Sequence, residues 1–197
     1  MLVKTYGSSV YGIKATKITV EVNVVTGFGL FLVGLPDNAV KESQHRIESA
    51  LMAYHHKMPG KKIVVNMAPA DIRKEGSAYD LTLAVGILAA NEQVSFEKLS
   101  KYLIMGELSL DGSLRPIKGV LPIALNAVEE GFEGIVIPVQ NAREAAVVSN
   151  LKVYGLENIG QVIDFLNGKS NFEPTFVDIN KEFEAATVEN ELDFSDV

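Results

Sequence analysis

The sequence contains no cysteine among its 197 residues. This absence excludes a disulfide scaffold, a thiolate metal site and cysteine catalysis, and it fits a reducing compartment. A long apolar run is also lacking, because the longest one, Leu81 to Ala90, has about half of the roughly 20 residues that a membrane span needs. The N-terminus has no apolar core of the kind found in secretory signals. We therefore expect a soluble cytoplasmic protein without a membrane partner.

Excess charge is absent from most of the chain. The formal net charge is −7, but residues 171–197 hold eight acids and one base, while residues 1–170 hold 17 acids and 17 bases. The acidity thus lies in the final segment and says little about the partners of the rest. We predict one α/β domain over residues 1–170 and an acidic linker over residues 171–197, where phenylalanines are scattered without a period.

Hydrophobic periodicity predicts alternating strands and helices along the domain. Lys17–Val25 alternates as a strand with one exposed face, Gly29–Val33 is predicted to be a buried strand, and Asp37 is predicted to cap a helix that ends before Pro59-Gly60. The remaining strands are predicted at 62–67, 102–110, 113–117, 134–139 and 151–154, and the remaining helices at 81–90, 121–130, 141–148 and 159–166. Asp111-Gly112 predicts a type I′ hairpin turn. The order indicates an α+β fold, a mixed two-layer α/β arrangement.

Signatures of nucleotide and metal binding are missing from the chain. The phosphate-binding pattern GxxxxGK[ST] does not occur, and the one GxG, at Gly27, has neither a third glycine nor a following helix. The histidines His45, His55 and His56 lack the i, i+4 spacing of zinc ligands on a helix, so we interpret them as an exposed helix face. We therefore expect neither a cofactor nor a metal in this chain.

Basic residues gather between positions 41 and 75, where seven bases face four acids. Lysine and arginine bind phosphates electrostatically, so this stretch is a candidate nucleic-acid contact, although a solvated surface explains it equally well. The candidate contact residues are Lys57, Lys61, Lys62, Arg73 and Lys74.

The loop from Arg73 to Asp80 opens onto the apolar helix and contains Ser77. A serine at a helix N-terminus lies where free N–H groups can stabilise an oxyanion, and Lys118 is the natural candidate for its base. The alternative is that Ser77 and Asp80 only cap the helix, which is the commoner role of such residues.

Five ordered motifs give the chain a family resemblance. They are VGLPDNAVKES from Val33, NMAPAD from Asn66 running into Lys74-Glu75-Gly76, GELSLDG from Gly106, RPIKGV from Arg115, and Ile137-Pro138 followed by NAREA from Asn141. These motifs resemble the N-terminal domain of the ComM/YifB family, the magnesium-chelatase-like AAA+ proteins. The resemblance extends over essentially the whole chain.

The resemblance implies a Lon-protease-domain-like fold, which contains βαβ units and belongs to the ribosomal-protein-type superfamily. Family members continue into an AAA+ ATPase module, where ATP and Mg are expected, and ComM members are implicated as hexameric DNA branch-migration helicases in natural transformation. The implied partners are therefore the chain's own AAA+ module, neighbouring subunits of a homo-hexamer, and DNA. The closing segment from Leu192 resembles the stretch before that module, so we expect a fragment that stops short of the ATPase.

The Lon resemblance places both members of the catalytic dyad on inert residues. When Lys74-Glu75-Gly76 is aligned with the Lon-type Lys-Asp-Gly, the nucleophilic serine falls on Ala78 and the catalytic lysine falls on Leu121. Neither side chain can attack or accept a proton, so no catalytic residue is assigned. We expect a non-catalytic Lon-like module, and the alternative is a peptidase with a displaced Ser77–Lys118 dyad.

Overall fold

The larger layer of the fold is a four-stranded sheet in the order β1–β2–β4–β3. The structure is a computed structural model that describes residues 1–95 and 97–177. Strands β1 (Leu2–Tyr11), β2 (Lys14–Val25) and β4 (Lys62–Ala68) pair antiparallel, and β3 (Gly29–Val33) pairs parallel to β4 at the edge. Helix α1 (Asn38–Ala53) connects the two parallel strands and completes a βαβ unit, as the resemblance implied.

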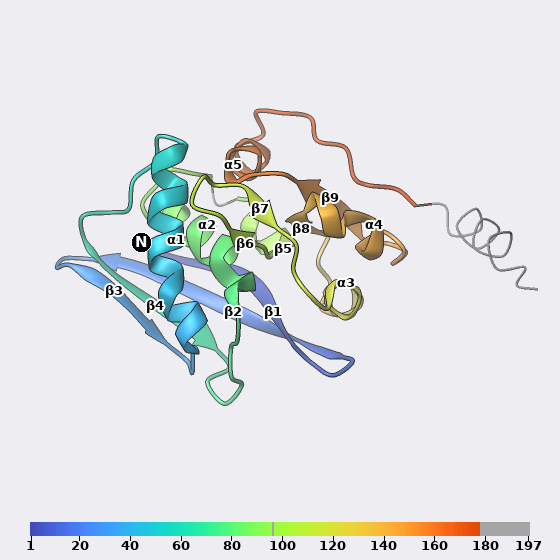
Figure 1. Cartoon of the computed structure of the whole chain (residues 1–197), viewed down its shortest axis with the longest axis horizontal. Coiled ribbons are helices and arrows are strands. Elements are labelled where there is room, and N and C mark those ends of the chain that lie inside the picture. The colour runs from blue at the N-terminus through green and yellow to red at the C-terminus, as the bar shows by residue number, and fades with distance from the viewer. Residues whose placement is uncertain (96, 178–197) are drawn as a thin grey trace, which may run out of the picture.

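Helix α2 (Asp80–Ala90) packs against β1 and β2 of this sheet, and α1 packs against α2 (Figure 1). The short 3-10 helix η1 (Ser77–Tyr79) leads directly into α2. All 11 residues of α2 are buried, which explains why its sequence is apolar on every side. Among the helices of residues 1–95 and 97–177, none is long and apolar enough to cross a membrane.

A second, parallel sheet has the order β5–β8–β9, and three helices accompany it. Its strands are β5 (Tyr102–Ile104), β8 (Gly134–Pro138) and β9 (Lys152–Leu156), and the helices are α3 (Val120–Glu129), α4 (Ala142–Ala145) and α5 (Ile159–Asn167). A small hairpin pairs β6 (Glu107–Leu108) with β7 (Leu114–Arg115), and the 3-10 helices η2 (Leu99–Lys101) and η3 (Val139–Asn141) complete the element order. The predicted α+β class is confirmed.

Several elements differ from the sequence-based expectation. Strand β1 was not predicted, because its buried face includes the polar Thr5, whose Oγ1 donates to the Thr82 carbonyl oxygen over 3.1 Å. Strand β3 was expected to be buried but lies at the sheet edge with Phe31 and Val33 each 49% exposed. The strand expected at 102–110 is divided into β5 and β6, because the Gly106 N–H turns away to the Ala78 carbonyl oxygen over 2.9 Å.

The predicted type I′ turn is also wrong. Of its two central residues only Gly112 has a positive φ, +83°, whereas that turn needs two. The Gly112 N–H instead donates to the Ser109 carbonyl oxygen over 2.9 Å, and the Ser109 N–H donates to the Ser113 carbonyl oxygen over 2.9 Å. The glycine therefore closes a longer loop, in which three residues lie between the hydrogen-bonded Ser109 and Ser113.

The end of the domain lies slightly beyond residue 170. The Thr175 N–H donates to the Val153 carbonyl oxygen over 2.7 Å, and the Phe172 ring centroid lies 6.3 Å from that of Phe165. The chain therefore remains packed on the second sheet through Thr175. Most of the predicted acidic linker, residues 178–197, lies outside the described residues.

Asp37 joins two of the sequence motifs. Its Oδ1 accepts from the Val40 N–H over 2.8 Å, which confirms the predicted helix cap, and its Oδ2 accepts from the Gly76 N–H over 3.0 Å. The Asp37 N–H also donates to the Lys74 carbonyl oxygen over 2.9 Å. The turn before Asp37 requires Gly34, because a Cβ there would lie 2.1 Å from the Met67 carbonyl oxygen at a φ of +98°. The loop that leads to Ser77 is thus held against the start of α1.

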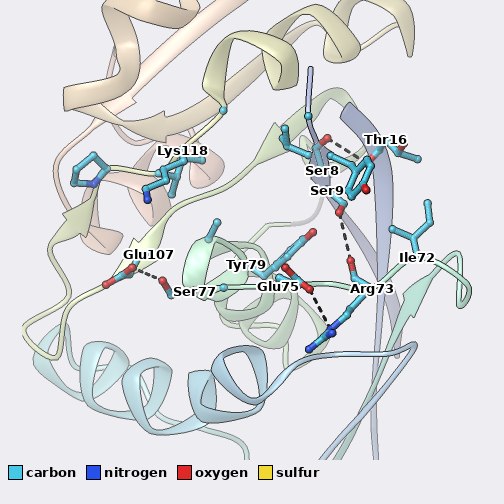
Figure 2. Close-up of a pocket in the computed structure, with 18 residues that line it drawn as sticks. Ser8, Ser9, Thr16, Ile72, Arg73, Glu75, Ser77, Tyr79, Glu107 and Lys118 are labelled. Carbon is cyan, nitrogen blue, oxygen red and sulfur yellow. Dashed lines mark hydrogen bonds and ion pairs between the residues drawn. The ribbon is translucent and has the colours of Figure 1, made fainter. Parts of the chain in front are cut away.

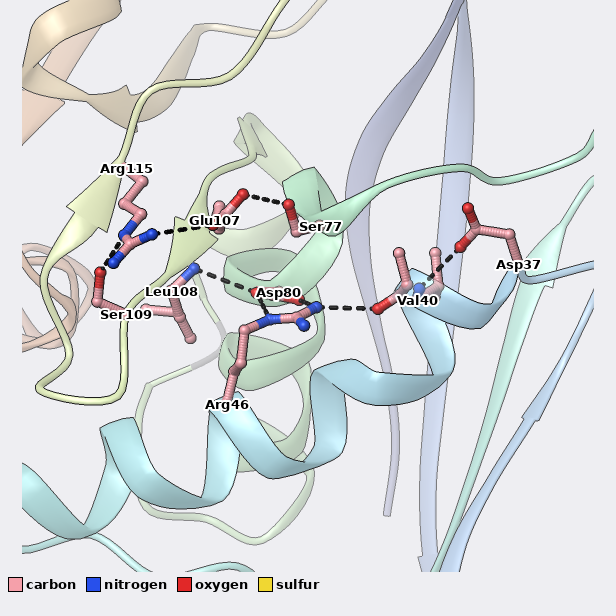
Figure 3. A network of polar contacts seen from close by, with 10 residues as sticks. Asp37, Val40, Arg46, Ser77, Asp80, Glu107, Leu108, Ser109 and Arg115 are labelled. Carbon is pink, nitrogen blue, oxygen red and sulfur yellow. Dashed lines mark hydrogen bonds and ion pairs between the residues drawn. The ribbon is translucent and has the colours of Figure 1, made fainter.

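A bidentate ion pair connects α1, α2 and β6 (Figure 3). Arg46 donates from Nε to Asp80 Oδ2 over 2.6 Å and from Nη2 to Asp80 Oδ1 over 2.9 Å, and Nη2 also donates to the Ala39 carbonyl oxygen. The Leu108 N–H donates to Asp80 Oδ2 over 3.2 Å. Burial raises the pKa of Asp80, and the guanidinium opposes that shift. Because the Asp80 side chain is only 1% exposed, its charge depends on these partners.

Substitution of Asp80 is expected to destabilise the fold strongly. In Asp80→Ala the Arg46 guanidinium loses its carboxylate and the Leu108 N–H loses its acceptor, so the free energy of unfolding should fall by about 3–5 kcal/mol. The matched control is Glu75→Ala, which removes an exposed ion pair with Arg73 and should cost less than about 1 kcal/mol. Denaturant titration measures both values, and similar small losses in the two variants would contradict the assigned role of Asp80.

Candidate functional site

A cavity of about 990 Å³ is enclosed by three segments of the chain (Figure 2). One wall is the end of β1 with the following turn, including Ser9 and Tyr11. The second wall is the loop from Ile72 to Tyr79, and the third is the segment from Pro116 to Gly119 together with Glu107. The cavity therefore collects the loop in which the Lon resemblance places the nucleophile and the segment just before the predicted position of its base.

Ser77 lies in this cavity at the start of η1, and its hydroxyl donates to the Glu107 carboxylate. Figure 2 shows this contact, with Lys118 on the same side of the cavity. The other Glu107 oxygen, Oε1, lies 3.9 Å from Arg115 Nη1, so an arginine faces the same carboxylate. Ser77 thus has a carboxylate partner that sequence reasoning did not identify.

Neither of the two expected dyad positions has a reactive side chain, and only Ala78 lines the cavity. Ala78 lines the cavity as a half-buried methyl group, next to Ser77. Leu121 is in the first turn of α3 and is 38% exposed, and its backbone N–H donates to Glu144 Oε1 over 3.1 Å. Lys118 lines the cavity two residues before α3 begins. The structure therefore brings Ser77 and Lys118 to one cavity, with Glu107 as the hydrogen-bond partner of the serine.

Tyr79 forms part of the cavity wall and is 2% exposed. Burial raises the pKa of Tyr79 to about 12, and a hydrogen bond with Ser9 partly opposes the shift. The phenol is consequently protonated at neutral pH and offers the cavity a hydrogen-bond donor rather than a base.

The candidate nucleic-acid contact residues are divided between two ends of β4. Lys57 and Lys61 are exposed and precede this strand, and Lys62 is its first residue. Arg73 follows the strand, lines the cavity, and forms a 3.1 Å ion pair with Glu75. Strand β4 extends roughly 20 Å from Lys62 to Ala68. The five residues therefore do not form one continuous surface.

Lys74 is not at the surface at all. Its side chain is completely buried, and its Nζ donates to the Pro69 carbonyl oxygen. Burial lowers the pKa of Lys74, because the ammonium has lost its water. The expectation of a phosphate contact at Lys74 is corrected on this ground, since a buried ammonium that ties two parts of a loop together is unavailable to a ligand outside.

The histidines do not gather into a metal site. His45 and His55 are exposed, and His56 Nδ1 lies 3.2 Å from Gln93 Oε1. Within residues 1–95 and 97–177, no group of three or more His, Cys, Asp or Glu side chains is arranged to hold a metal ion.

Two positioning residues were present in the motifs without an assigned role. Asn141 is 6% exposed, and its amide accepts from the Ile117 N–H over 2.9 Å and donates to the Ile117 carbonyl oxygen over 3.0 Å. This pair of bonds fixes the backbone directly before Lys118. Glu107 is the second such residue, as the partner of Ser77. The sequence signal for this role was Asn141 itself, three residues after Pro138. Its partner, Ile117, could not be inferred because it lies 24 positions earlier in the chain.

Comparison with known proteins gives the family. The sequence model of the family "Subunit ChlI of Mg-chelatase" matches residues 20–141. Competence protein ComM of Haemophilus influenzae is 40% identical over 194 residues, which cover 98% of this chain and 38% of ComM. The YifB protein of Escherichia coli (strain K12) is 39% identical over 163 residues, or 82% of this chain and 32% of YifB.

A more distant similarity connects the chain to a protease. Lon protease 2 of Bacillus subtilis is 26% identical over 117 residues, which cover 58% of this chain and 21% of the protease. The chain spans less than two fifths of the length of the ComM and YifB relatives it matches. It belongs to the magnesium-chelatase ChlI-like family and is related within it to the ComM and YifB proteins.

Proposed function

We propose that this chain is a non-catalytic, Lon-like N-terminal module of a ComM/YifB-type AAA+ ATPase, and that it assists oligomerisation and DNA handling by the motor. The supporting observation is that the expected nucleophile position, in the cavity wall, is Ala78, and that the expected base position, in the first turn of α3, is Leu121. The surrounding contacts, from Asp37 to Gly76 and from Asn141 to Ile117, hold the cavity walls in place without the dyad. Such a module contributes binding surface and shape rather than bond cleavage.

ATP and Mg belong to the longer protein in this proposal. This chain has no GxxxxGK[ST] loop, and the N-terminal ends of its helices near the cavity carry contacts to protein groups, such as Glu144 on the Leu121 N–H. The residues present here therefore do not fit a nucleoside triphosphate with its metal ion. We place that site in the AAA+ module, where it would drive a branch-migration motor used in natural transformation or recombination.

Deletion of residues 1–177 from the full-length protein tests the module's contribution. We expect a smaller oligomer by light scattering, together with weaker DNA binding and slower unwinding, because contacts repeated around an oligomer act together. The matched control is full-length Ser77→Ala, which keeps the fold of the module and should leave all three properties intact. Unchanged assembly, binding and unwinding after deletion would contradict the proposal.

The alternative function is a serine peptidase with Ser77 as nucleophile and Lys118 as base, favoured by their common cavity. We expect no such activity, because the Ser77 hydroxyl donates to Glu107 and the hydrogen bond required from nucleophile to lysine is replaced. Wild type and Ser77→Ala are incubated with unfolded casein and a serine-reactive probe, and Lys118→Ala is the second variant. Equal cleavage and equal labelling are expected, whereas labelling that depends on both residues would establish the peptidase.

The DNA contact retained in the proposal is the group Lys57, Lys61 and Lys62. Residues 49–70 contain these three lysines and no acid, which supports a local positive potential. The triple variant Lys57→Gln, Lys61→Gln, Lys62→Gln should lower the slope of log affinity against log salt by about 2–3, the value for three phosphate contacts. Arg73→Gln is the control and should leave the slope unchanged, since Arg73 lies at the other end of β4. An unchanged slope in the triple variant would remove DNA contact from this face.

A further inference from the structure

Strand β3 leaves an open, apolar edge on the four-stranded sheet. Among residues 1–95 and 97–177, β4 is the one strand that pairs with it, and no charged residue occurs from Val22 to Pro36. We define the β3 edge patch as its exposed apolar side chains, namely Phe28 (84% exposed), Phe31 (49%), Val33 (49%) and Leu35 (56%). Natural sheets protect such edges with charges, prolines or a covering segment, because their free N–H and C=O groups accept another strand. Here the edge itself contains no charge that would prevent pairing.

A lysine borders the β3 edge patch, and two more lysines precede it in the sequence. Lys62, which lies beside Gly29 in the ladder, places its Nζ 4.8 Å from the centroid of the Phe31 ring. Lys57 and Lys61 precede it, and the absence of acids between residues 49 and 70 leaves these cations without a local counter-charge in the sequence. A ligand for this surface should therefore combine a backbone that can pair with β3, apolar or aromatic side chains for the patch, and negative charge for the lysines.

The chain itself contains one segment of that composition. Residues 178–197 hold seven acids and a single base, Lys181, and intersperse Phe183, Leu192 and Phe194 among them. We propose that this acidic segment of a neighbouring copy of the chain binds the β3 edge patch as an added strand, with its carboxylates next to Lys57, Lys61 and Lys62. The partner is thus a second copy of this chain, and its contribution is a named acidic, phenylalanine-bearing segment.

The position of the chain's described end favours a neighbouring copy over the same molecule. The bond from Thr175 to Val153 holds the end of the described chain on β9, and Figure 1 shows β9 and β3 at opposite ends of the body. A contact from one end of a copy to the other end of the next is heterologous, and contacts of this type build rings or chains. The segment would cover the lysines that the proposed function assigns to DNA, but it does not depend on that function, because it requires only the edge and the charges.

The lack of native cysteine allows a direct test in the intact 197-residue chain. One variant carries Val33→Cys on β3, and a second carries Ala186→Cys in the acidic segment. When the two variants are mixed under mild oxidation, the heterodimer should form at least about tenfold faster than in a control mixture, since docking raises the effective concentration of the thiols. The control replaces Val33→Cys with Ile13→Cys, a position 92% exposed in the turn after β1. Non-reducing electrophoresis measures both rates.

Charge reversal provides the second measurement. When Lys61→Glu and Lys62→Glu are added to the Val33→Cys variant, heterodimer formation should become several-fold slower. For the original pair of variants, with both lysines intact, the rate of heterodimer formation should fall as the salt concentration rises. Matching unfolding midpoints confirm that the variants are folded. A rate equal to that of the Ile13→Cys control would overturn the proposal. So would a chain carrying both cysteines that links only within itself in dilute solution, because the segment would then cover its own β3.

Discussion

The buried ion pair between Arg46 and Asp80 determines the relative positions of α1, α2 and β6. Asp80 begins α2 and is three residues after Ser77, while its second partner, the Leu108 N–H, is adjacent to Glu107. The same carboxylate therefore positions both members of the Ser77–Glu107 contact in the cavity. The Arg46 side chain completes the arrangement from the middle of α1, whose start is in turn tied by Asp37 to Gly76. A charge that could not remain buried alone thus organises the loop around the cavity.

Local patterns predicted much of this arrangement. The all-apolar run after Asp80 indicated a central helix because no face needed to remain polar, and Asp37 was predicted as a cap because its carboxylate can accept from a free N–H nearby. Prediction failed where a distant partner decides the outcome. Thr5 is buried because Thr82 supplies a carbonyl, and Lys74 is buried because Pro69 does, so neither side chain matched the polarity expected of its position.

The same limitation affected the candidate site. Lys57, Lys61, Lys62, Arg73 and Lys74 are close in sequence, but β4 separates them into two groups and one lysine lies inside the fold. Ser77 and Lys118, 41 positions apart, line one cavity, although sequence reasoning considered this pair only as the alternative to a non-catalytic module. The partner Glu107 was missed because an acid in a strand has no pattern that predicts a serine opposite it. The family resemblance indicated the positions of the absent dyad, and the structure showed the cavity and the Ser77–Glu107 contact.

In the proposed function, the cavity belongs to a Lon-like scaffold in which Ser77 has a structural role. A double-mutant cycle on Ser77 and Glu107, using Ser77→Ala, Glu107→Gln and the double variant, tests that explanation most directly through the free energy of unfolding. If the hydroxyl serves to hold β6 against η1, the coupling energy should be about 0.5–3 kcal/mol, as for residues in contact. A coupling energy of zero, with Ser77 reactive toward a serine-directed probe, would contradict a structural role for this serine.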